Sequence, residues 1–333
     1  MQNKSIENKK ILMFAPCFFG YREIISEHLK EIGCQVDLYD ERPNNSAFCK
    51  IMLRYNVKLY HPIVMKYYLS VIEENKDKDY DYILVIKSEA INPQIFNKLK
   101  EAYPNAEFIL YLWDSVENVP DGENKIKLYD RVLTFDPVDA EKYQIPFLPI
   151  PYGKEYTKYE NNADYKYDVA FIGTAHSVRP RVVKQIKQQC EKMGRKCFTY
   201  FYSPHILVYL FNKLTNKDYR YISLKEINFD SLSTEEVCQI YNTSQCVLDI
   251  EHPKQHGTTT RPVEMLPMKK KIITTNICVK NFDFYNDKNF LIIDRDNPII
   301  EESFFESEYI PVGQDLLYKY SPKKFVETLF EIQ

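Results

Sequence analysis

The feature that most constrains this fold is a regular alternation of short apolar runs with longer segments of helical periodicity. The chain opens with the apolar run KILMFA at residues 10–15, continues with a helical pattern at 21–33, and reaches a second apolar run at 34–40. A strand, a helix and a strand in this order form a βαβ unit, whose two strands are parallel. The alternation therefore predicts a doubly wound α/β sheet.

The alternation continues beyond this unit and then starts again in the second half. In the first half we predict strands at 80–88, 107–114, 131–136 and 147–152 and helices at 60–75 and 92–103. A polar, tyrosine-rich stretch at 151–167 has no clear period and is the predicted linker. The second half then shows strands at 167–174, 196–202, 246–250, 270–276 and 289–294, with helices at 179–194, from about 233, and at 321–332.

The length of the chain also favours two domains. At 333 residues it exceeds the size at which a single hydrophobic core usually stops growing. We therefore predict two Rossmann-like domains, an N-terminal domain at 1–152 and a C-terminal domain at 153–333. In such sheets a ligand binds at the carboxyl ends of the strands.

Charge and composition narrow the classes of partner and compartment. The formal charge of −3, from 44 basic and 47 acidic residues, gives no general attraction to a phosphate backbone, so nucleic acid is not an expected partner. The first apolar run is broken by Pro16, and no apolar run approaches the roughly 18 residues of a membrane span. Eight cysteines without C-x-x-C spacing indicate reduced thiols and a cytoplasmic protein.

The stretch QHGTTTRPVEMLPMKKKIITTN at 255–276 carries the strongest chemical signal. Its glycine follows a predicted strand, and the residues after it can start a short helix whose amides and hydroxyls would bind an anion. Arg261 lies one helical turn from Glu264, where a guanidinium can grip phosphate and a carboxylate can accept hydrogen bonds from a ribose. The lysines at 269–271 would add positive charge. The residues predicted here to bind a nucleotide are His256, Gly257, Thr258, Thr259, Thr260, Arg261 and Glu264.

Two further groups of residues lie at predicted strand ends. Gly173 begins a strand-to-helix turn that would bring Thr174, His176 and Arg179 near a diphosphate. In the first domain, Glu23, Glu89, Asp114 and Asp136 are candidates for a general base that deprotonates an acceptor hydroxyl. Of these, Asp114 and Glu23 are the predicted catalytic residues. The spacing His252-x3-His256 lacks a third ligand, so no metal site is predicted.

These residues resemble those of a known family. The run GTTTRPVEMLPMKKKIITTN, after VLDIEHPKQH, resembles the donor-binding segment of GT-B glycosyltransferases, especially the CgeB-like and lipopolysaccharide or capsule branch. The run YDVAFIGTAHSVRPRVV resembles the opening of the same C-terminal domain. Two N-terminal runs, LYLWDSVEN and LTFDPVDAEKYQIPFLPIPY, resemble segments before the interdomain linker. The resemblance implies GT-B architecture, with two facing Rossmann-like domains.

The resemblance also implies an activity. A nucleotide-sugar donor would bind mainly to the second domain, with Glu264 matching the ribose-binding glutamate and Arg261, with residues 257–260, matching the pyrophosphate contacts. A hexosyl group would pass to a glycan or lipid-linked acceptor, held mainly by the first domain, in bacterial surface-polysaccharide biosynthesis. No cofactor and no metal would be needed. Peripheral association with a membrane is expected if the acceptor is membrane-bound.

One departure from the family pattern and two alternatives remain open. Many retaining GT-B enzymes carry a glutamate eight residues before the ribose-binding glutamate, and this chain has His256 there. The stereochemical outcome is therefore open. A nucleotide-sugar epimerase also uses two Rossmann-like domains, but it needs no acceptor. An inactive nucleotide-sugar-binding protein would bind the donor without consuming it.

Overall fold

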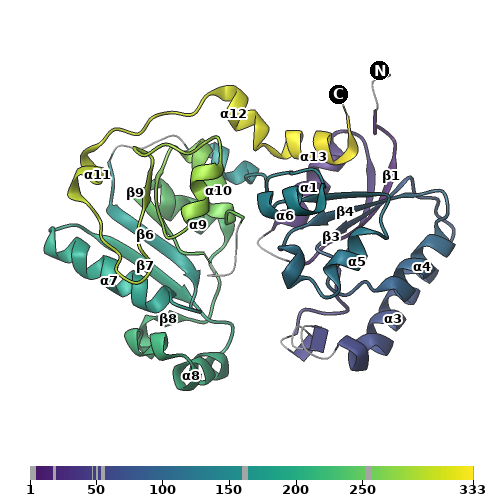
Figure 1. Ribbon diagram of the computed structural model, residues 1–333, viewed down its shortest axis with the longest axis horizontal. Helices are drawn as coiled ribbons and strands as arrows, with labels where there is room; N and C mark the ends of the chain where they lie inside the picture. The colour runs from purple at the N-terminus through teal and green to yellow at the C-terminus, as the bar shows by residue number, and fades with distance from the viewer. Residues whose placement is uncertain are drawn as a thin grey trace. The chain divides into compact units, whose positions relative to one another are not determined.

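The chain forms two compact α/β units, which are drawn in Figure 1. The computed structural model describes residues 5–17, 20–46, 48–49, 52–53, 57–159, 164–251 and 257–332. The first unit comprises Met1–Pro151 together with Lys319–Gln333, and the second comprises Tyr152–Tyr318. Each unit is built on its own parallel sheet, which confirms the predicted α/β class with two Rossmann-like domains.

The first unit contains a five-stranded sheet in the order β2-β1-β3-β4-β5, with every adjacent pair parallel. Its elements are β1 (Lys10–Phe14), α1 (Tyr21–Glu31), β2 (Gln35–Tyr39), α3 (Val57–Glu74), β3 (Tyr82–Ile86), α4 (Pro93–Ala102), β4 (Glu107–Leu112), η1 (Val116–Asn118), α5 (Gly122–Ile126), β5 (Arg131–Thr134), α6 (Pro137–Tyr143) and α13 (Pro322–Phe330).

The second unit contains a six-stranded sheet in the order β11-β10-β9-β6-β7-β8, again with every adjacent pair parallel. Its elements are η2 (Lys154–Lys158), β6 (Tyr167–Thr174), α7 (Arg179–Lys192), β7 (Cys197–Tyr202), α8 (Ile206–Thr215), η3 (Lys217–Tyr221), η4 (Leu224–Glu226), β8 (Ile227–Asn228), α9 (Thr234–Asn242), β9 (Ser244–Asp249), α10 (Thr260–Met268), β10 (Lys271–Thr274), η5 (Ile277–Asn281), β11 (Phe290–Ile292) and α11 (Glu302–Glu306). The remaining helix, α12 (Gln314–Lys319), contains the boundary between the units.

The apolar runs form the central strands because both faces of each sheet are covered. Alternate residues of β1 enter different cores: Leu12 and Phe14 pack in the cluster on one face, and Ile11 and Met13 pack in the cluster on the other. Strands buried on both faces have nearly continuous apolar sequences, as the central strands of parallel sheets do. This is why the runs could be recognised in the sequence.

The C-terminal helix α13 belongs to the first unit, whereas the sequence-based boundary placed all of 153–333 in the second domain. Figure 1 shows α13 beside α1, and the two helices are in contact. Phe325, Leu329 and Phe330 are buried in the same core cluster as Ile11 and Leu84 of the first sheet. The apolar face of this helix therefore completes the first unit.

Several local features differ from the sequence-based prediction. The run at 147–152 does not form a strand, since it makes only an isolated bridge from Phe147 to Thr134. The predicted linker contains η2, which packs on α9 and α10 and buries Tyr156. The helix α8 and the short strand β8 were not predicted. Within the residues that the structure describes, every helix is too short or too polar to cross a membrane.

Each sheet has one point where the direction of strand order reverses. In the first sheet β2 and β3 lie on opposite sides of β1, and in the second sheet β7 and β9 lie on opposite sides of β6. At such a point, the loops that follow two adjacent strands run to opposite faces of the sheet. A crevice for a ligand is left between them, at the carboxyl ends of the strands. The two switch points therefore locate one candidate site in each unit.

Candidate functional site

The switch point of the second unit is organised around the carboxylate of Asp249, at the end of β9. This side chain is fully buried and accepts three hydrogen bonds. Thr259 Oγ1 donates to Oδ1 over 2.8 Å, Arg261 Nη1 donates to the same oxygen over 3.1 Å, and Thr274 Oγ1 donates to Oδ2 over 3.1 Å. Asp249 thereby joins the start of α10 to the ends of β9 and β10.

Arg261 is held from three directions. Besides its ion pair with Asp249, its Nε donates to the hydroxyl of Tyr241 over 3.0 Å, and its Nη2 donates to the carbonyl of Ile172 in β6 over 2.7 Å. Burial acts to lower the pKa of Arg261, but Tyr241 and Asp249 outweigh it, so the pKa is raised. The guanidinium is therefore permanently charged and fixed in position.

Arg179 begins α7, at the end of the neighbouring strand β6, and its surroundings differ from those of Arg261. Its Nε donates to the carbonyl of Ile250 over 2.8 Å, and its Nη1 donates to the carbonyl of Thr174 over 3.3 Å. No carboxylate among the described residues forms an ion pair with it. Burial and the nearby charge of Arg261 lower the pKa of Arg179 to about 10. Arg179 is thus an enclosed cation whose protein partners are neutral carbonyl groups.

These residues form one connected group, which we call the Asp249 cluster: Arg179, Tyr241, Asp249, Thr259, Arg261 and Thr274. Sequence reasoning found both arginines and Thr259 but missed Tyr241, Asp249 and Thr274. Asp249 lies next to the end of the predicted strand at 246–250, which precedes the signal-bearing stretch, and this position could have identified it.

Glu264 lies one turn after Arg261 on α10, as the spacing predicts. Its side chain is buried, with the residue only 7% exposed, and its charge is close enough to influence both Arg261 and Tyr156. Tyr156 comes from η2, which packs against α10. The structure therefore encloses this carboxylate beneath η2, within the same group of charges as Arg261.

The other predicted residues of this stretch occupy distinct places. Thr258 is buried, and Thr259 is the N-cap residue of α10, whose first helical residue is Thr260. The carbonyl of Gly257 accepts a hydrogen bond from Asn276 Nδ2 over 3.2 Å. His256 lies outside the described residues, as does His252, so the spacing that they share is not described.

Gly173 permits a close approach of Arg179 to strand β6. A Cβ atom at this position would lie 3.1 Å from the ring of Phe171 and 3.4 Å from Nη1 of Arg179. A Cβ atom here would therefore press on the Phe171 ring and would come into van der Waals contact with the guanidinium. Thr174 and His176 contribute backbone carbonyls here, the first to Arg179 Nη1 and the second to the amide of Arg179 over 3.2 Å.

The expectation that the lysines at 269–271 add charge to this site is wrong. Lys269 follows the last residue of α10, at the opposite end from Arg261. The Nζ of Lys270 donates to the carbonyl of Asn242 over 2.7 Å, and that of Lys271 donates to the carbonyl of Phe304 over 2.7 Å. Burial lowers the pKa of Lys270 to about 8. Both ammonium groups are used to satisfy buried carbonyls.

A second buried ion pair lies next to the Asp249 cluster and was not predicted. Glu251 is 5% exposed, pairs with Arg295, and accepts a hydrogen bond from Thr275 Oγ1 over 2.5 Å. Glu251 follows β9 and Thr275 follows β10, so this pair fixes the chain just beyond the same edge of the sheet.

At the switch point of the first unit, Asp114 is engaged in an ion pair. Its Oδ2 lies 2.8 Å from Nζ of Lys87, and its side chain is 40% exposed. Lys87 follows β3, and both Lys87 and Ser88 have positive φ, at 81° and 57°. Two consecutive non-glycine residues in this region indicate local backbone strain. Asp114 is thus both accessible and held in an ion pair.

Lys87 belongs to a larger group at this edge, the Lys87 cluster: Glu41, Arg42, Lys87, Glu89, Asp114 and Lys125. Arg42 Nε and Nη2 donate to Glu89 Oε2 over 2.9 and 2.5 Å. Glu41 is fully buried, accepts from the amide of Ala90 over 2.5 Å, and its Oε2 has no hydrogen-bond partner. Burial raises the pKa of Glu41 to about 7, and the charge of Glu89 acts in the same direction.

Two other base candidates of the first unit have different surroundings. Glu23 lies in the first turn of α1, pairs with Nε of its neighbour Arg22 over 2.6 Å, and is partly exposed. Asp136 is fully buried, caps α6 by accepting from the amide of Val138 over 2.9 Å, and accepts from Ser115 Oγ over 2.5 Å. Because Asp136 has a structural role and no access to solvent, its candidacy as a base is withdrawn.

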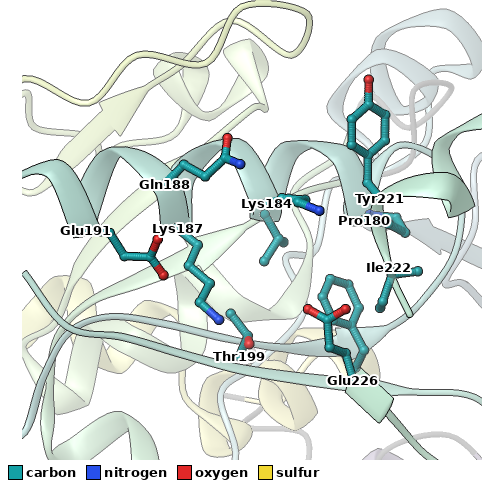
Figure 2. Close-up of a pocket in the computed structure, with 11 residues that line it drawn as sticks. Pro180, Lys184, Lys187, Gln188, Glu191, Thr199, Tyr221, Ile222 and Glu226 are labelled. Carbon is teal, nitrogen blue, oxygen red and sulfur yellow. The ribbon is translucent and has the colours of Figure 1, made fainter. Parts of the chain in front are cut away.

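One pocket of the second unit lies apart from these residues. It has a volume of about 150 Å³ and is lined by side chains of α7, β7, η3 and η4, among them Lys184, Lys187, Thr199 and Tyr221 (Figure 2). None of its lining residues belongs to the Asp249 cluster. Among the described residues, no group of three His, Cys, Asp or Glu side chains is arranged to hold a metal ion.

Comparisons with known proteins identify the fold. No protein-family model matches the chain, and no curated protein matches it. Solved structures do match over nearly its whole length. The catalytic domain of starch synthase IV from Arabidopsis thaliana, bound to ADP and acarbose, is 9% identical with a TM-score of 0.52, and the match covers 98% of this chain and 96% of that one.

Two further structures match over a similar extent. The α,α-trehalose 6-phosphate synthase from Burkholderia multivorans is 8% identical with a TM-score of 0.57, covering 98% of this chain and 93% of that one. The OtsA apo structure is 11% identical with a TM-score of 0.60, covering 97% and 99%.

At identities this low, such similarity shows the fold. The chain has the GT-B fold. The two Rossmann-like units of this fold correspond to the two units described above, each of which is built on a parallel sheet.

Proposed function

We propose that this chain is a glycosyltransferase that binds a nucleotide-sugar donor at the Asp249 cluster. The donor's diphosphate lies against Arg179 and the start of α10, and its sugar passes to a glycan or lipid-linked acceptor. The proposal includes the finer expectations from sequence: a hexosyl group, no metal, a cytoplasmic location and a role in bacterial surface-polysaccharide biosynthesis.

The observation that carries this proposal is the environment of Arg179. Arg179 is half-buried, and the carboxylate whose charge partly offsets its desolvation, Asp249, is already paired with Arg261. A second guanidinium nearby adds repulsion, as the lowered pKa of Arg179 reflects. A diphosphate placed beside it would supply the missing negative charge. The site is thus arranged to favour an anion over the empty state.

Three other features support an anion at the same place. The site lies at the carboxyl ends of β6 and β9, where the strand order reverses. The start of α10 presents backbone amides whose helix dipole favours negative charge. Gly173 lets Arg179 lie close to β6. The catalytic domain of starch synthase IV, which has the same fold, was solved with ADP bound.

In the reaction these groups would stabilise the leaving nucleoside diphosphate. Negative charge accumulates on the phosphate oxygens as the sugar bond breaks, and fixed cations that meet this charge lower the barrier. Arg261 is positioned by Asp249, Tyr241 and Ile172 before any substrate binds, so no reorganisation is needed. Glu264 is proposed for the ribose, with Thr258 and Thr260 beside it.

On the acceptor side we propose Asp114 as the general base. Its side chain is 40% exposed, against 20% for Lys87, and an accessible carboxylate can take up the proton of an acceptor hydroxyl. Glu23 stays the second candidate. Replacing Asp114 with Asn should leave the affinity for the nucleoside diphosphate unchanged. It should lower the rate at which nucleoside diphosphate is released from the nucleotide-sugar donor by at least about 100-fold. An inactive nucleotide-binding protein would show no such release in either form.

A thermal-shift panel of nucleoside diphosphates and nucleotide sugars tests the donor site. One nucleoside diphosphate should raise the melting temperature of the parent chain, since a ligand at 100 times its Kd stabilises the fold by about 2.7 kcal/mol. The shift should disappear in Arg179→Met, Arg261→Ala and Glu264→Ala. Arg220→Met, on the exposed surface of η3, is the matched control and should respond like the parent. If no nucleotide shifts the parent, or Arg179→Met responds fully, the donor-site proposal fails.

A further inference from the structure

Helix α8 of the second unit carries an apolar face that is left exposed by the residues that the structure describes. Five of its large side chains are exposed: Ile206, Leu207, Leu210, Phe211 and Leu214. Leu207 and Phe211 are each 65% exposed, and Leu214 is 88% exposed. Large apolar side chains scattered singly on a surface are ordinary, but a contiguous group of them marks an interaction site.

The five side chains lie on one side of the helix. At about 100° of rotation per residue, positions 206, 207, 210, 211 and 214 fall within an arc of about 140°. The opposite side packs against the unit: Tyr209 is buried, and Nζ of Lys213 donates to the carbonyls of Tyr219 and Ile222 over 2.7 Å each. The helix is therefore anchored to η3 on its inner side and presents a continuous apolar stripe outward.

Basic side chains are frequent in the chain segments before and after this stripe. Residues 179–226 hold eleven Lys or Arg and three Asp or Glu, in a chain whose formal charge is −3. In η3 and η4, next to α8, the side chains of Lys217, Arg220 and Lys225 are exposed, and no acidic partner among the described residues pairs with them. Basic groups beside an exposed apolar face suit an anionic lipid surface, which accepts apolar side chains between its headgroups and attracts cations.

The position and isolation of α8 agree with this use. Figure 1 shows α8 beside β8, an edge strand of the second sheet, away from α10. The exposed apolar residues of α3 provide a contrast. Leu59, Ile63 and Leu69 also fall within an arc of about 120° of that helix, but the exposed polar residues Lys66 and Ser70 lie between them, so no continuous apolar stripe forms there.

We propose that α8 is an interfacial helix through which the chain adsorbs on an anionic lipid bilayer. The apolar stripe enters the boundary between headgroups and acyl chains, and Lys217, Arg220 and Lys225 contact the acidic headgroups. This surface shares no residue with the Asp249 cluster. Adsorption would bring the protein to a lipid-linked acceptor, but it does not depend on the donor site.

Vesicle flotation with the purified full chain tests this surface. Vesicles of phosphatidylcholine with about one third phosphatidylglycerol should carry the protein upward, and vesicles of phosphatidylcholine alone should bind it at least tenfold more weakly. Raising the salt from 0.1 to about 1 M should weaken binding to the anionic vesicles, because the Debye length falls from about 10 to about 3 Å.

Two matched triple variants identify the surface. Leu207→Ser/Phe211→Ser/Leu214→Ser should reduce binding to anionic vesicles at least tenfold. Leu59→Ser/Ile63→Ser/Leu69→Ser removes three exposed apolar residues from α3 and should bind like the parent. Both should keep the melting temperature and the nucleotide-induced shift of the parent, so a failure of this surface is distinct from a failure of the donor site.

A fluorescence probe measures insertion directly. Trp113 is the one tryptophan of the chain, and it lies in the first unit. In Trp113→Phe/Leu214→Trp the only tryptophan lies on α8. Its fluorescence emission should shift to the blue when anionic vesicles are added. The proposal is overturned if the parent ignores anionic vesicles, or if the α8 variant binds as well as the α3 variant. It is also overturned if sedimentation shows a dimer that the α8 variant dissociates, because a second copy would then cover the stripe.

Discussion

At the scale of single residues, Arg179 and Arg261 of the second unit differ in how the protein compensates their positive charge. Arg261 is paired with Asp249 and hydrogen-bonded to Tyr241 and Ile172. Arg179 has two backbone carbonyls and no ion-pair partner among the described residues. A charge that the fold itself neutralises serves stability, and a charge that the fold leaves open is available to a ligand. The two side chains should therefore respond differently to replacement.

Replacing each arginine with methionine separates these roles. Arg261→Met leaves Asp249 buried without its cation and should lower the free energy of unfolding by about 3–5 kcal/mol. Arg179→Met removes an unpaired charge and leaves two carbonyl acceptors unsatisfied, so these effects partly cancel and the change should stay within about 1 kcal/mol. Urea unfolding measures both. Equal losses in the two variants would contradict the distinction.

Glu41 predicts a pH dependence of stability. Its pKa is raised from 4.5 to about 7, first by burial, with Glu89 adding to the rise and Ala90, Arg42 and Lys125 opposing it. Because the folded protein then binds a proton that the unfolded chain has lost, stability falls as pH rises from about 4.5 to about 7. Glu41→Gln keeps the neutral form, so it should be more stable than the parent by roughly 3 kcal/mol at pH 8.

The comparison with pH 5 and with a surface site makes this prediction specific. At pH 5 nearly all Glu41 side chains in the folded protein are protonated, whereas about three quarters of those in the unfolded chain are ionised, so the difference between Glu41→Gln and the parent should fall to about 1 kcal/mol. Glu117→Gln, at an exposed position of η1, should follow the parent at both pH values. A constant difference between the Glu41→Gln and parent curves from pH 5 to pH 8 would contradict the account.

At the scale of elements, α13 shows how a late segment completes an early core. Leu329 and Phe330 are fully buried among side chains of the first sheet. Leu329→Ala should destabilise the first unit by about 2–4 kcal/mol, since it leaves a cavity between α13 and the sheet. Hydrogen exchange should then quicken at the amides of β1 and β3.

The same experiment contains its control. Exchange at β6 and β9 should not change, because the core of the second unit has no contribution from α13. Lys323→Ala, at an exposed position of the same helix, should leave both sets of amides as protected as in the parent. Equal loss of protection in both sheets would show that α13 does not belong specifically to the first unit.

Most of these elements could be predicted, because central parallel strands are apolar along their whole length. The positions of β1, β3 and β6 follow from such runs, and the limits of β6 agree with those predicted. The helix α8 could not be predicted, since ILVYLF is as apolar as a buried strand and its exposure depends on the tertiary structure. For the same reason the sequence located the helix α13 but not the unit on which it packs.

The sequence indicated several residues of the candidate site, but it did not reveal the hydrogen bonds and ion pairs that join them. The stretch around Gly257 indicated Arg261 and Glu264, and the turn after Gly173 indicated Arg179. The ion pair between Arg261 and Asp249 joins residues twelve apart in different elements, so local spacing does not reveal it. The lysines at 270 and 271 look like phosphate ligands in sequence, but burial directs them to carbonyl groups.

At the scale of the whole molecule, the two units share one plan. Each has a parallel sheet with a point where strand order reverses, and each places a cluster of charged side chains at that edge. In the first unit the cluster contains an accessible carboxylate, Asp114. In the second unit it contains a cation without an acidic partner among the described residues, Arg179. This difference is the reason for which we propose that the anionic donor binds to the second unit.

Hydrogen–deuterium exchange with the nucleoside diphosphate that binds best tests this assignment most directly. The account predicts slower exchange on binding at residues 173–182 and 257–266, at the starts of α7 and α10, and none of this protection in Arg179→Met. Protection confined to the first unit around residues 87–90, with the edge of β6 and β9 unchanged, would contradict it.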